Sequence, residues 1–289
     1  MPRGVNIVDE AKLQNRLWTP AIIRPALWLD ANDLSTISIA TGISEWRDKS
    51  GNGRHVSQAT GGTQPTLTRN GLNGLPVLSF NGSQYLTSPA AVSTWNFLHN
   101  TNGSTVIAVW KAGNVSDPNT FYALLGTNGA ASANIGYSIG YEDRVTALRN
   151  NTGVASVSRG VSGQSAVVNV TADGVHPANT PVLISQVADP NNGTAANRSF
   201  LRINQTLTQN NANTFAPSAS NASFALQIGA SGNNRDPMVG YIAEIVVFSS
   251  IVNDRVRQQV EGYLAHKWGL RTSLVASHPF SNRPPLIGD

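Results

Sequence analysis

Apolar residues occur along the chain in short stretches that glycine, proline and asparagine interrupt about every ten residues. The stretches are rich in Val, Ile, Thr, Phe and Tyr, and two of them, 200–203 and 241–248, alternate so that the two faces of the strand differ. Many short strands at this spacing are typical of a β-sandwich or a β-barrel. The predicted strands are Ala26–Leu29, Leu75–Phe80, Thr105–Trp110, Ala123–Leu125, Tyr137–Ile139, Val145–Leu148, Val182–Gln186, Phe200–Ile203, Phe224–Ile228 and Tyr241–Phe248.

One polar region permits two interpretations. Residues 150–179 contain the run VASVSRGVSGQSAVVNVTADG, in which small and polar residues interrupt every apolar stretch. The region is predicted to be either a long loop or a pair of exposed edge strands.

A helix is predicted near the C-terminus. Its apolar stripe falls at helical spacing and consists of Val256, Val260, Tyr263, Leu264 and Trp268. Asn253 can cap the start of this helix, and Gly269 can end it. Because the strand 241–248 comes directly before, we expect the stripe to lie against one face of a sheet.

The chain shows no linker that would divide it into two domains, and we predict one domain over residues 26–270. The flanking segments 1–25 and 271–289 are rich in proline, so neither reads as a core strand. We expect both to be extended arms, held either by neighbouring subunits or by the surface of the domain.

The charge pattern argues against nucleic-acid binding. The chain carries 20 basic and 16 acidic residues, a net charge of +4, and its arginines are scattered singly from Arg3 to Arg283. The basic stripe that neutralises phosphates in a nucleic-acid-binding protein is therefore missing. The chain has no cysteine, which excludes disulfides and thiolate metal sites.

No membrane partner is expected. Charges at Asp9, Glu10 and Lys12 lie where a cleaved signal peptide needs an apolar stretch, and apolar runs such as 245–248 are too short to span a bilayer. We therefore expect a protein without a cleaved signal peptide.

Five segments resemble the laminin-G-like domains of the concanavalin A-like lectin and glucanase superfamily. They are 26–37 (ALWLDANDLSTI), 45–55 (EWRDKSGNGRH), 77–86 (VLSFNGSQYL), 240–248 (GYIAEIVVF) and 254–270 (DRVRQQVEGYLAHKWGL), and the last is similar to the closing helix of bacterial and phage members. The resemblance implies an all-β jelly-roll sandwich of two antiparallel sheets with one C-terminal helix. It implies no single function, because this scaffold hosts lectins, glycosidases and structural modules.

The strand 244–248 bears on a glycosidase function. In laminarinase-type glycosidases the comparable strand resembles Glu-x-Asp-x-x-Glu, and retaining hydrolysis needs two carboxylates about 5 Å apart. Here Glu244 shares its face with Val246 and Phe248, so the further acids are replaced by apolar residues. We favour a partly buried Glu244 that hydrogen-bonds to serine or backbone near the helix. A second carboxylate within about 6 Å of Glu244 would favour the glycosidase.

An oxygen-rich set of side chains in the first two resembling segments is the best candidate for a metal site. It consists of Asp30, Asp33, Asp48 and Asn52. Hard cations such as calcium take carboxylate and amide oxygens, so a calcium site is one interpretation. The other, which we favour, is that these side chains cap their own backbone in Asx-turns.

Aromatic residues in or near loops could stack on sugars. Trp46, Trp95 and Tyr141 are the candidates for such a ligand-binding face, against the alternative that each is an ordinary exposed aromatic residue. The other tryptophans on predicted elements, Trp28, Trp110 and Trp268, are predicted to pack in the core.

These features lead to a non-enzymatic protein as the main hypothesis. The phage resemblance, the absent signal peptide, the proline-rich ends and the low charge favour a virion component, such as a head decoration, tail or fibre protein, located on the outside of the particle. Its partners would be other virion proteins or copies of itself, together with cell-surface glycan. The alternative is a lectin-like carbohydrate-binding module of a bacterial surface protein, and a glycosidase is the third hypothesis.

Overall fold

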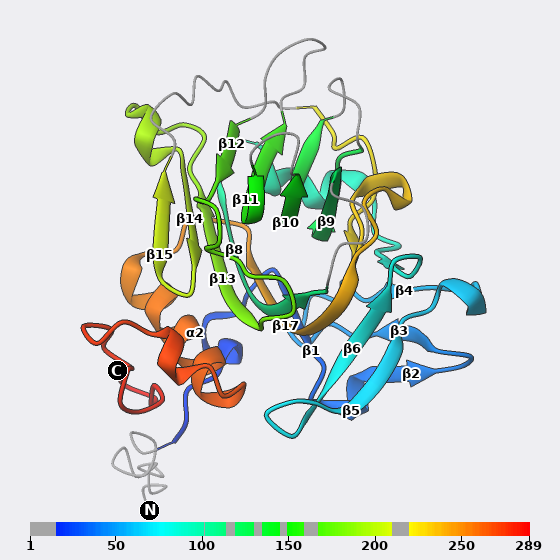
Figure 1. Ribbon diagram of the computed structural model, residues 1–289, viewed down its shortest axis with the longest axis horizontal. Coiled ribbons are helices and arrows are strands. Elements are labelled where there is room, and N and C mark those ends of the chain that lie inside the picture. Colours follow the sequence, from blue (N-terminus) through cyan, green and yellow to red (C-terminus); the bar gives the residue numbers. More distant parts are fainter. Residues whose placement is uncertain are drawn as a thin grey trace, which may run out of the picture.

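The computed structural model of the chain describes residues 16–100, 102–113, 119–129, 135–144, 149–158, 167–209 and 220–289. These residues form two antiparallel β-sheets and a C-terminal helix, α2 (Asp254–Lys267) (Figure 1). This is the all-β jelly-roll sandwich with one C-terminal helix that the sequence predicts.

The sheet that bears α2 has eight strands. Seven of them follow the order β15 (Thr206–Gln209), β14 (Ser199–Ile203), β13 (Val182–Ala188), β8 (Ser104–Ala112), β17 (Val239–Phe248), β6 (Leu75–Asn81) and β5 (Thr66–Leu72). The eighth, β1 (Leu27–Asp30), pairs with the second half of β17.

The other sheet has nine strands. Their order is β12 (Val167–Val170), β11 (Arg149–Ser158), β10 (Gly136–Arg144), β9 (Asn119–Gly126), β16 (Gln227–Ile228), β7 (Leu86–Thr87), β4 (Val56–Ser57), β3 (Ile43–Trp46) and β2 (Ile37–Ile39). Short 3₁₀ helices connect the strands, at η1 (Pro20–Ile23), η2 (Leu34–Thr36), η3 (Gly61–Thr63), η4 (Val92–Leu98), η6 (Ala195–Asn197), η7 (Gly232–Asn234) and η8 (Arg271–Ser273).

Eight of the ten predicted strands are present. Phe224–Ile228 forms a strand only over its last two residues, and Val145–Leu148 lies outside the described residues. The ambiguous region 150–179 forms strands rather than one long loop, since β11 and β12 lie within or overlap it, and β12 is the edge of its sheet. Several strands of two to four residues were not predicted, because a strand this short gives no visible alternation of apolar and polar residues.

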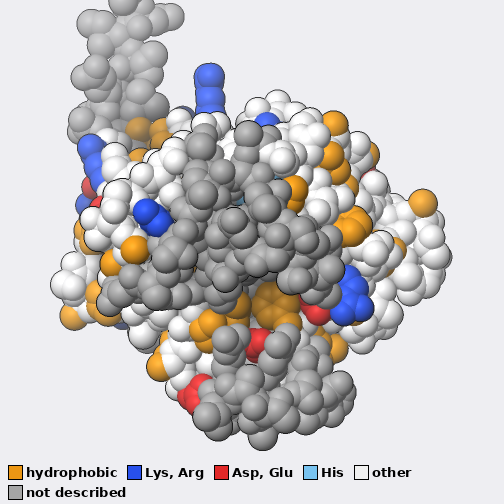
Figure 2. Space-filling model, turned by 90° about the horizontal axis from the view of Figure 1, so that it is seen from above, with side chains coloured by type: hydrophobic (Ala, Val, Ile, Leu, Met, Phe, Trp, Pro, Cys, Tyr) orange, Lys and Arg blue, Asp and Glu red, His pale blue; other side chains and the backbone are white. Residues whose placement is uncertain are grey.

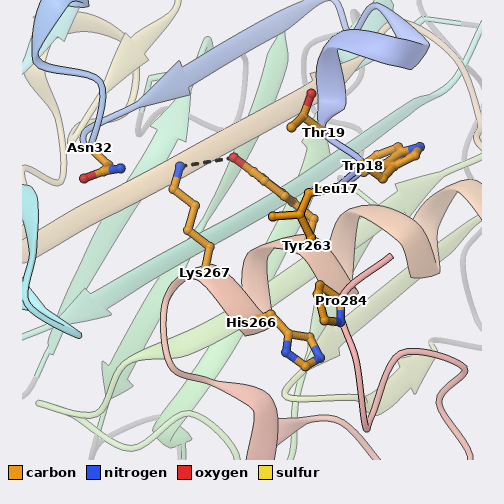
Figure 3. A pocket seen from close by; sticks show the side chains of 8 residues that line it. All are labelled: Leu17, Trp18, Thr19, Asn32, Tyr263, His266, Lys267 and Pro284. Atoms are coloured by element: carbon orange, nitrogen blue, oxygen red, sulfur yellow. Dashed lines mark hydrogen bonds between the residues drawn. The ribbon is translucent and has the colours of Figure 1, made fainter. Parts of the chain in front are cut away.

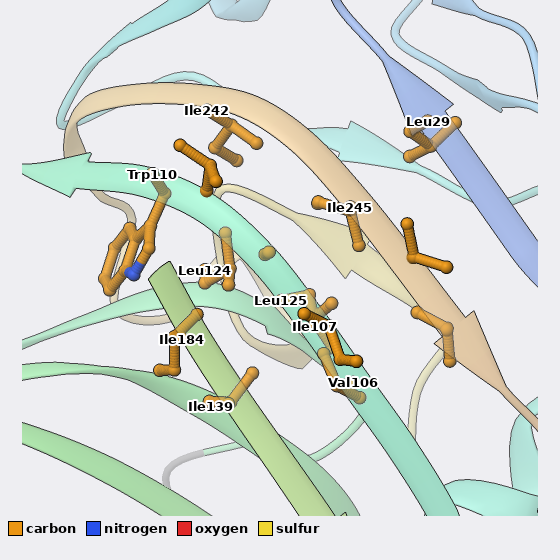
Figure 4. Packing of buried hydrophobic residues seen from close by; sticks show 14 of the residues in the cluster. Leu29, Val106, Ile107, Trp110, Leu124, Leu125, Ile139, Ile184, Ile242 and Ile245 are labelled. Carbon is orange, nitrogen blue, oxygen red and sulfur yellow. The ribbon is translucent and has the colours of Figure 1, made fainter. Parts of the chain in front are cut away.

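The hydrophobic core lies between the two sheets. Trp110, Ile184 and Ile245 of the eight-stranded sheet pack over Leu125 and Ile139 of the nine-stranded sheet, and all five are fully buried (Figure 4). Burial of this apolar surface is the main favourable contribution to folding.

A bulge in β17 decides which way Glu244 points. Ile242 pairs with Trp110 of β8, whereas Glu244 pairs with the adjacent residue Val109, which leaves Ala243 as the extra residue. Trp110 faces the second sheet, where its ring meets His176. Because the bulge reverses the alternation, Glu244 faces the opposite side, on which α2 packs.

Helix α2 begins and ends where the sequence predicts. The Asn253 side chain accepts a hydrogen bond from the Val256 amide at 2.9 Å, and Gly269 follows the helix with a φ of +73°. The helix covers the outer face of the eight-stranded sheet, where the Ser185 hydroxyl of β13 donates to Glu261 at 2.8 Å. Within the described residues, no helix combines the length and apolar character needed to cross a membrane.

The described parts of both predicted arms lie on the surface of the domain. The Trp18 amide donates to the Pro285 carbonyl at 3.0 Å, and the Ile287 amide donates to the Arg16 carbonyl at 2.8 Å. The Gln259 amide on α2 donates to the Asp289 carbonyl at 2.9 Å. Residues 16–25 and 271–289 are therefore not free extensions, and residues 1–15 lie outside the description.

Charged side chains do not gather on the uncovered part of the face in Figure 2. Lys and Arg side chains stand singly there among uncharged polar ones. This agrees with the scattered arginines of the sequence.

Candidate functional site

A pocket of about 520 Å³ opens beside α2, and we call it the α2 pocket. It is lined by Leu17, Trp18, Thr19, Asn32, Tyr263, His266, Lys267 and Pro284 (Figure 3). A smaller pocket of about 310 Å³ shares Trp18 with it and lies nearer the start of α2. The α2 pocket is of the size at which proteins hold small ligands, about 300–1,000 Å³.

Several separate segments of the chain form the walls of the α2 pocket. Tyr263, His266 and Lys267 lie on one side of the last turns of α2, because residues three and four apart share a face. Asn32 follows β1, and Pro284 belongs to the C-terminal segment. The Trp18 ring meets the Tyr263 ring edge to face, with 6.3 Å between ring centroids.

A cluster of five charged residues, which we call the charged floor, lies beneath the pocket: Asp30, Asp33, Lys49, Glu244 and Lys267. The Lys267 ammonium lies 2.7 Å from Asp30 and 2.6 Å from Glu244. The Lys49 ammonium lies 2.8 Å from Asp30 and 2.9 Å from Asp33. Each carboxylate is thus paired, as buried charges must be.

Glu244 is fully buried at the centre of the charged floor. Its Oε1 accepts from Trp28 Nε1 at 2.7 Å and from the Tyr263 hydroxyl at 3.0 Å, and its Oε2 accepts from Trp268 Nε1 at 2.8 Å and from Lys267. Burial raises the pKa of Glu244, the Asp30 charge raises it further, and Lys267 opposes both. A hydrogen-bonded Glu244 next to the helix was predicted, but its partners are indole, phenol and ammonium groups rather than serine or backbone.

The distance criterion set for a glycosidase is met, since Asp30 and Glu244 hold the same ammonium between them and their nearest oxygens are less than about 6 Å apart. The chemistry is not available in this arrangement. Asp30 is 3% exposed and Glu244 is 0% exposed, and Lys267 occupies the space between them. A glycosidase needs one of the two carboxylates to attack the sugar and the other to protonate the leaving group.

The predicted metal residues do not form a cation site. Asp30 and Asp33 bind lysine ammonium groups, and Asp33 also accepts from the Ser35 hydroxyl at 2.6 Å. Among the described residues, no group of three His, Asp or Glu side chains is arranged to hold a metal. The lysines supply the positive charge that a calcium ion would have supplied.

Asp48 and Asn52 serve the turns instead. Asp48 accepts from the backbone amides of Trp28 at 3.0 Å, Ser50 at 2.9 Å and Arg54 at 3.0 Å. The Asn52 side chain donates to the Pro25 carbonyl at 3.0 Å, so its amide nitrogen points into the loop. The Asx-turn interpretation therefore holds for Asp48, whereas Asn52 ties its loop to the residues before β1.

The predicted aromatic ligand face is corrected by the structure. Trp46 in β3, Trp95 in η4 and Tyr141 in β10 are all fully buried, so none presents its ring to a ligand. The Trp95 ring packs against Phe97 with 6.0 Å between centroids, and the Tyr141 hydroxyl donates to Asn151 at 2.7 Å. Trp46 lies in a strand of four residues and Trp95 in a 3₁₀ helix, while β10 extends past the predicted end at Ile139 and includes Tyr141. Trp28, Trp110 and Trp268 are buried, as predicted.

The residues that do line the pocket were not predicted as ligand-binding residues. The sequence places Tyr263 in the apolar stripe of the helix and Leu17 to Thr19 in an arm. The spacing of Tyr263, His266 and Lys267 along the helix is the sequence signal that places three polar or aromatic groups side by side.

Comparison with known proteins confirms the fold. No protein-family model and no curated protein sequence matches the chain. The binding domain of botulinum neurotoxin DC, solved in complex with SialylT, superimposes with a TM-score of 0.53 at 13% identity, over 81% of this chain and 50% of that one. The binding domain of botulinum neurotoxin serotype D gives a TM-score of 0.51 at 13% identity, over 82% and 50%. The likeness shows a concanavalin A-like sandwich.

The chain spans half the length of these toxin binding domains. A carbohydrate-binding module of the Ruminococcus gnavus sialidase, bound to α2,3-sialyllactose, gives a TM-score of 0.41 at 12% identity, over 54% of this chain and 80% of that one. Fold likeness at this level carries no ligand site to this chain, because one scaffold supports many sites.

Proposed function

We propose that the protein is a non-enzymatic carbohydrate-binding module and that the α2 pocket holds the saccharide. The observation that supports this most is the pairing of an aromatic wall with polar groups that have no partner. The Thr19 hydroxyl and the Asn32 side-chain amide make no hydrogen bond within the described residues, and both line the pocket. Ligand sites combine apolar and aromatic walls with a few such orienting groups.

The lining suits the two kinds of surface that a sugar ring offers. The C–H face of a sugar is apolar and can pack against Leu17, Pro284 and the Tyr263 ring. The hydroxyl groups at its edge can exchange hydrogen bonds with Thr19 and Asn32, each of which both donates and accepts. The likeness to binding domains of known structure supports a binding role for the fold.

The charged floor supports binding without hydrolysis. Asp30 and Glu244 are an acid pair beside the pocket, and both are bound to Lys267 and buried. Both ion pairs of Lys267 would have to break before either carboxylate could reach a substrate. The unpaired buried charges that result are strongly unfavourable.

The virion role and the location on a particle stay predictions. The structures named above are toxin and sialidase domains, and they do not bear on assembly into a particle. Native mass measurement of the protein from its source tests this role.

A glycan array tests the proposed function. Thr19→Ala combined with Asn32→Ala removes two polar groups from the pocket without breaking an internal hydrogen bond. Since each lost hydrogen bond costs about 0.5–1.5 kcal/mol, we expect the double variant to bind its saccharide roughly tenfold more weakly. Thr206→Ala, at an exposed position of the edge strand β15, is the matched control and should bind as the wild type does. Absence of binding to any saccharide by the wild-type protein contradicts the proposal.

A further inference from the structure

The cation in the α2 pocket has no hydrogen atom left for a ligand. Lys267 is the only Lys, Arg, Asp or Glu among the residues that line the pocket in the described part of the chain. An ammonium group has three donors. Lys267 donates to Asp30 Oδ1 at 2.7 Å, to Glu244 Oε2 at 2.6 Å and to the Tyr263 hydroxyl at 3.1 Å, and Figure 3 shows the last of these bonds.

Tyr263 is equally occupied. Its hydroxyl donates to Glu244 Oε1 at 3.0 Å and accepts from Lys267. His266 Nε2 donates to the Phe280 carbonyl at 2.8 Å, which fixes the ring against the C-terminal segment. Of the His266 ring, only Nδ1 remains for a ligand, and the other open groups are uncharged ones, foremost the Thr19 hydroxyl and the Asn32 amide.

The charged floor also contains more negative than positive groups. Asp30, Asp33 and Glu244 face Lys49 and Lys267, so three carboxylates surround two ammonium groups. The hydrogen bond from Ser35 and the Lys49 ammonium lower the pKa of Asp33, which keeps that carboxylate ionised. A ligand carboxylate in the pocket would meet this surplus of negative charge and find no free donor on Lys267.

We infer that the α2 pocket selects uncharged saccharides and discriminates against sialylated and other anionic ones. This inference rests on the proposed function and concerns the ligand class of the same pocket. It differs from what the named ligands of the similar structures would suggest, because the lysine that could have bound a carboxylate is already held by the protein's own acids.

The experiment is a glycan array made of matched pairs, each a neutral oligosaccharide with and without a terminal sialic acid, followed by calorimetry on the pairs that bind. We expect the neutral member to be bound at least about tenfold more tightly, since a ligand carboxylate would lose its hydration without gaining a charged partner. Binding of the neutral member should change less than about twofold between low and high salt, because no ligand charge is screened.

The possible results separate the two proposals. If the wild-type protein binds none of the saccharides, the proposed function is wrong. If it binds saccharides and the sialylated members bind as tightly as their neutral counterparts or more tightly, the function stands and the inference on ligand class is overturned.

A conservative variant tests separately whether the negative charge of the charged floor disfavours anionic saccharides. Asp33→Asn removes one negative charge from the floor at a partly exposed position outside the lining of the pocket. We expect this variant to bind neutral saccharides with unchanged affinity. The ratio of its affinity for a neutral saccharide to its affinity for the sialylated counterpart should fall by a few-fold. Asp189→Asn, which removes the same charge on the loop after β13, should leave the preference as it is. An identical preference in Asp33→Asn and in the wild type would contradict the role of the floor.

Discussion

Glu244 shows how a single buried carboxylate is stabilised in this protein. It is fully buried on the outer face of the eight-stranded sheet, and two indole groups, a phenol and an ammonium surround it. Each donor replaces a water molecule that the carboxylate lost on burial. Removing one donor therefore lowers the free energy of unfolding by more than the loss of that side chain's packing alone.

The indole hydrogen bond of Trp268 can be measured against a tryptophan that has none. Trp268→Phe removes a donor to Glu244, whereas Trp110→Phe removes an equally buried indole whose nitrogen has no partner in the described structure. Both changes leave a cavity. We expect Trp268→Phe to lower the free energy of unfolding by about 1–3 kcal/mol more than Trp110→Phe does, measured by urea denaturation. Equal losses would show that the hydrogen bond contributes nothing.

Two buried glutamates should respond to pH with opposite signs. Burial, and then the charge of Asp30, raises the pKa of Glu244 above its ordinary 4.5. Burial would also raise the pKa of Glu261, but hydrogen bonds and charges from His278, Arg257 and Ser185 hold it below 4.5. As the pH falls toward 4.5, the folded protein takes up a proton at Glu244 first and is stabilised. Below 4.5, the unfolded chain takes up a proton at Glu261 first, and stability is lost.

Denaturation of Glu244→Gln and Glu261→Gln over a pH series checks these signs. The free energy of unfolding of the wild type, minus that of Glu244→Gln, should increase as the pH falls from neutral toward 4.5. The free energy of unfolding of the wild type, minus that of Glu261→Gln, should decrease as the pH falls below 4.5. The same pH trend in both variants would contradict the assignment of opposite shifts.

At the scale of elements, the C-terminal segment and α2 depend on close contact. A Cβ atom added at Gly262 would lie 2.6 Å from the Phe280 Cβ atom, which is closer than two nonbonded carbon atoms can approach. His278 and Phe280 are both buried on this side of the helix. Gly262 is thus required by the packing of the segment, even though alanine is the better helix former.

Gly262→Ala tests that packing. Alanine in a helix interior gains about 1 kcal/mol in intrinsic propensity, yet we expect this variant to unfold at a lower temperature because the segment 271–289 must move away. Limited proteolysis should then cut that segment faster than in the wild type. Gln258→Ala, on the same helix, serves as the control and should change neither result. A more stable Gly262→Ala would show that the segment is not held by this contact.

At the scale of the whole molecule, we expect calcium to contribute nothing to the stability of the sandwich. The oxygens of Asp30, Asp33 and Asp48 are already hydrogen-bonded to lysines and amides. We expect the same melting temperature in EDTA as in excess calcium chloride, because a ligand stabilises a fold only by binding its native state. A higher melting temperature in calcium would reveal a site that these residues do not form.

The sequence allowed the fold class to be predicted because strands and helices leave local signals. Asn253, the apolar stripe and Gly269 delimit α2 through interactions within a few residues, and eight strands show apolar runs of sufficient length. The resemblance to laminin-G-like domains, read from five short segments, agrees with the observed sandwich.

The candidate site could not be predicted in the same way, because contacts between distant residues form it. Leu17 to Thr19, Asn32, Pro284 and the end of α2 line one pocket although they span nearly the whole chain. Trp46, Trp95 and Tyr141 were predicted to be accessible, yet the sheets enclose them. Burial of a single aromatic residue depends on what the rest of the chain places over it.

The amino-acid sequence by itself determined that this chain forms paired antiparallel sheets and one capped helix, since alternation and capping act between near neighbours. Only the tertiary structure decided what Glu244 does. A bulge at Ala243 turns its carboxylate from the core toward α2, where residues far apart in the chain supply its hydrogen bonds and Lys267 supplies its counter-charge. Strand register and long-range pairing set these contacts, and neither follows from local pattern.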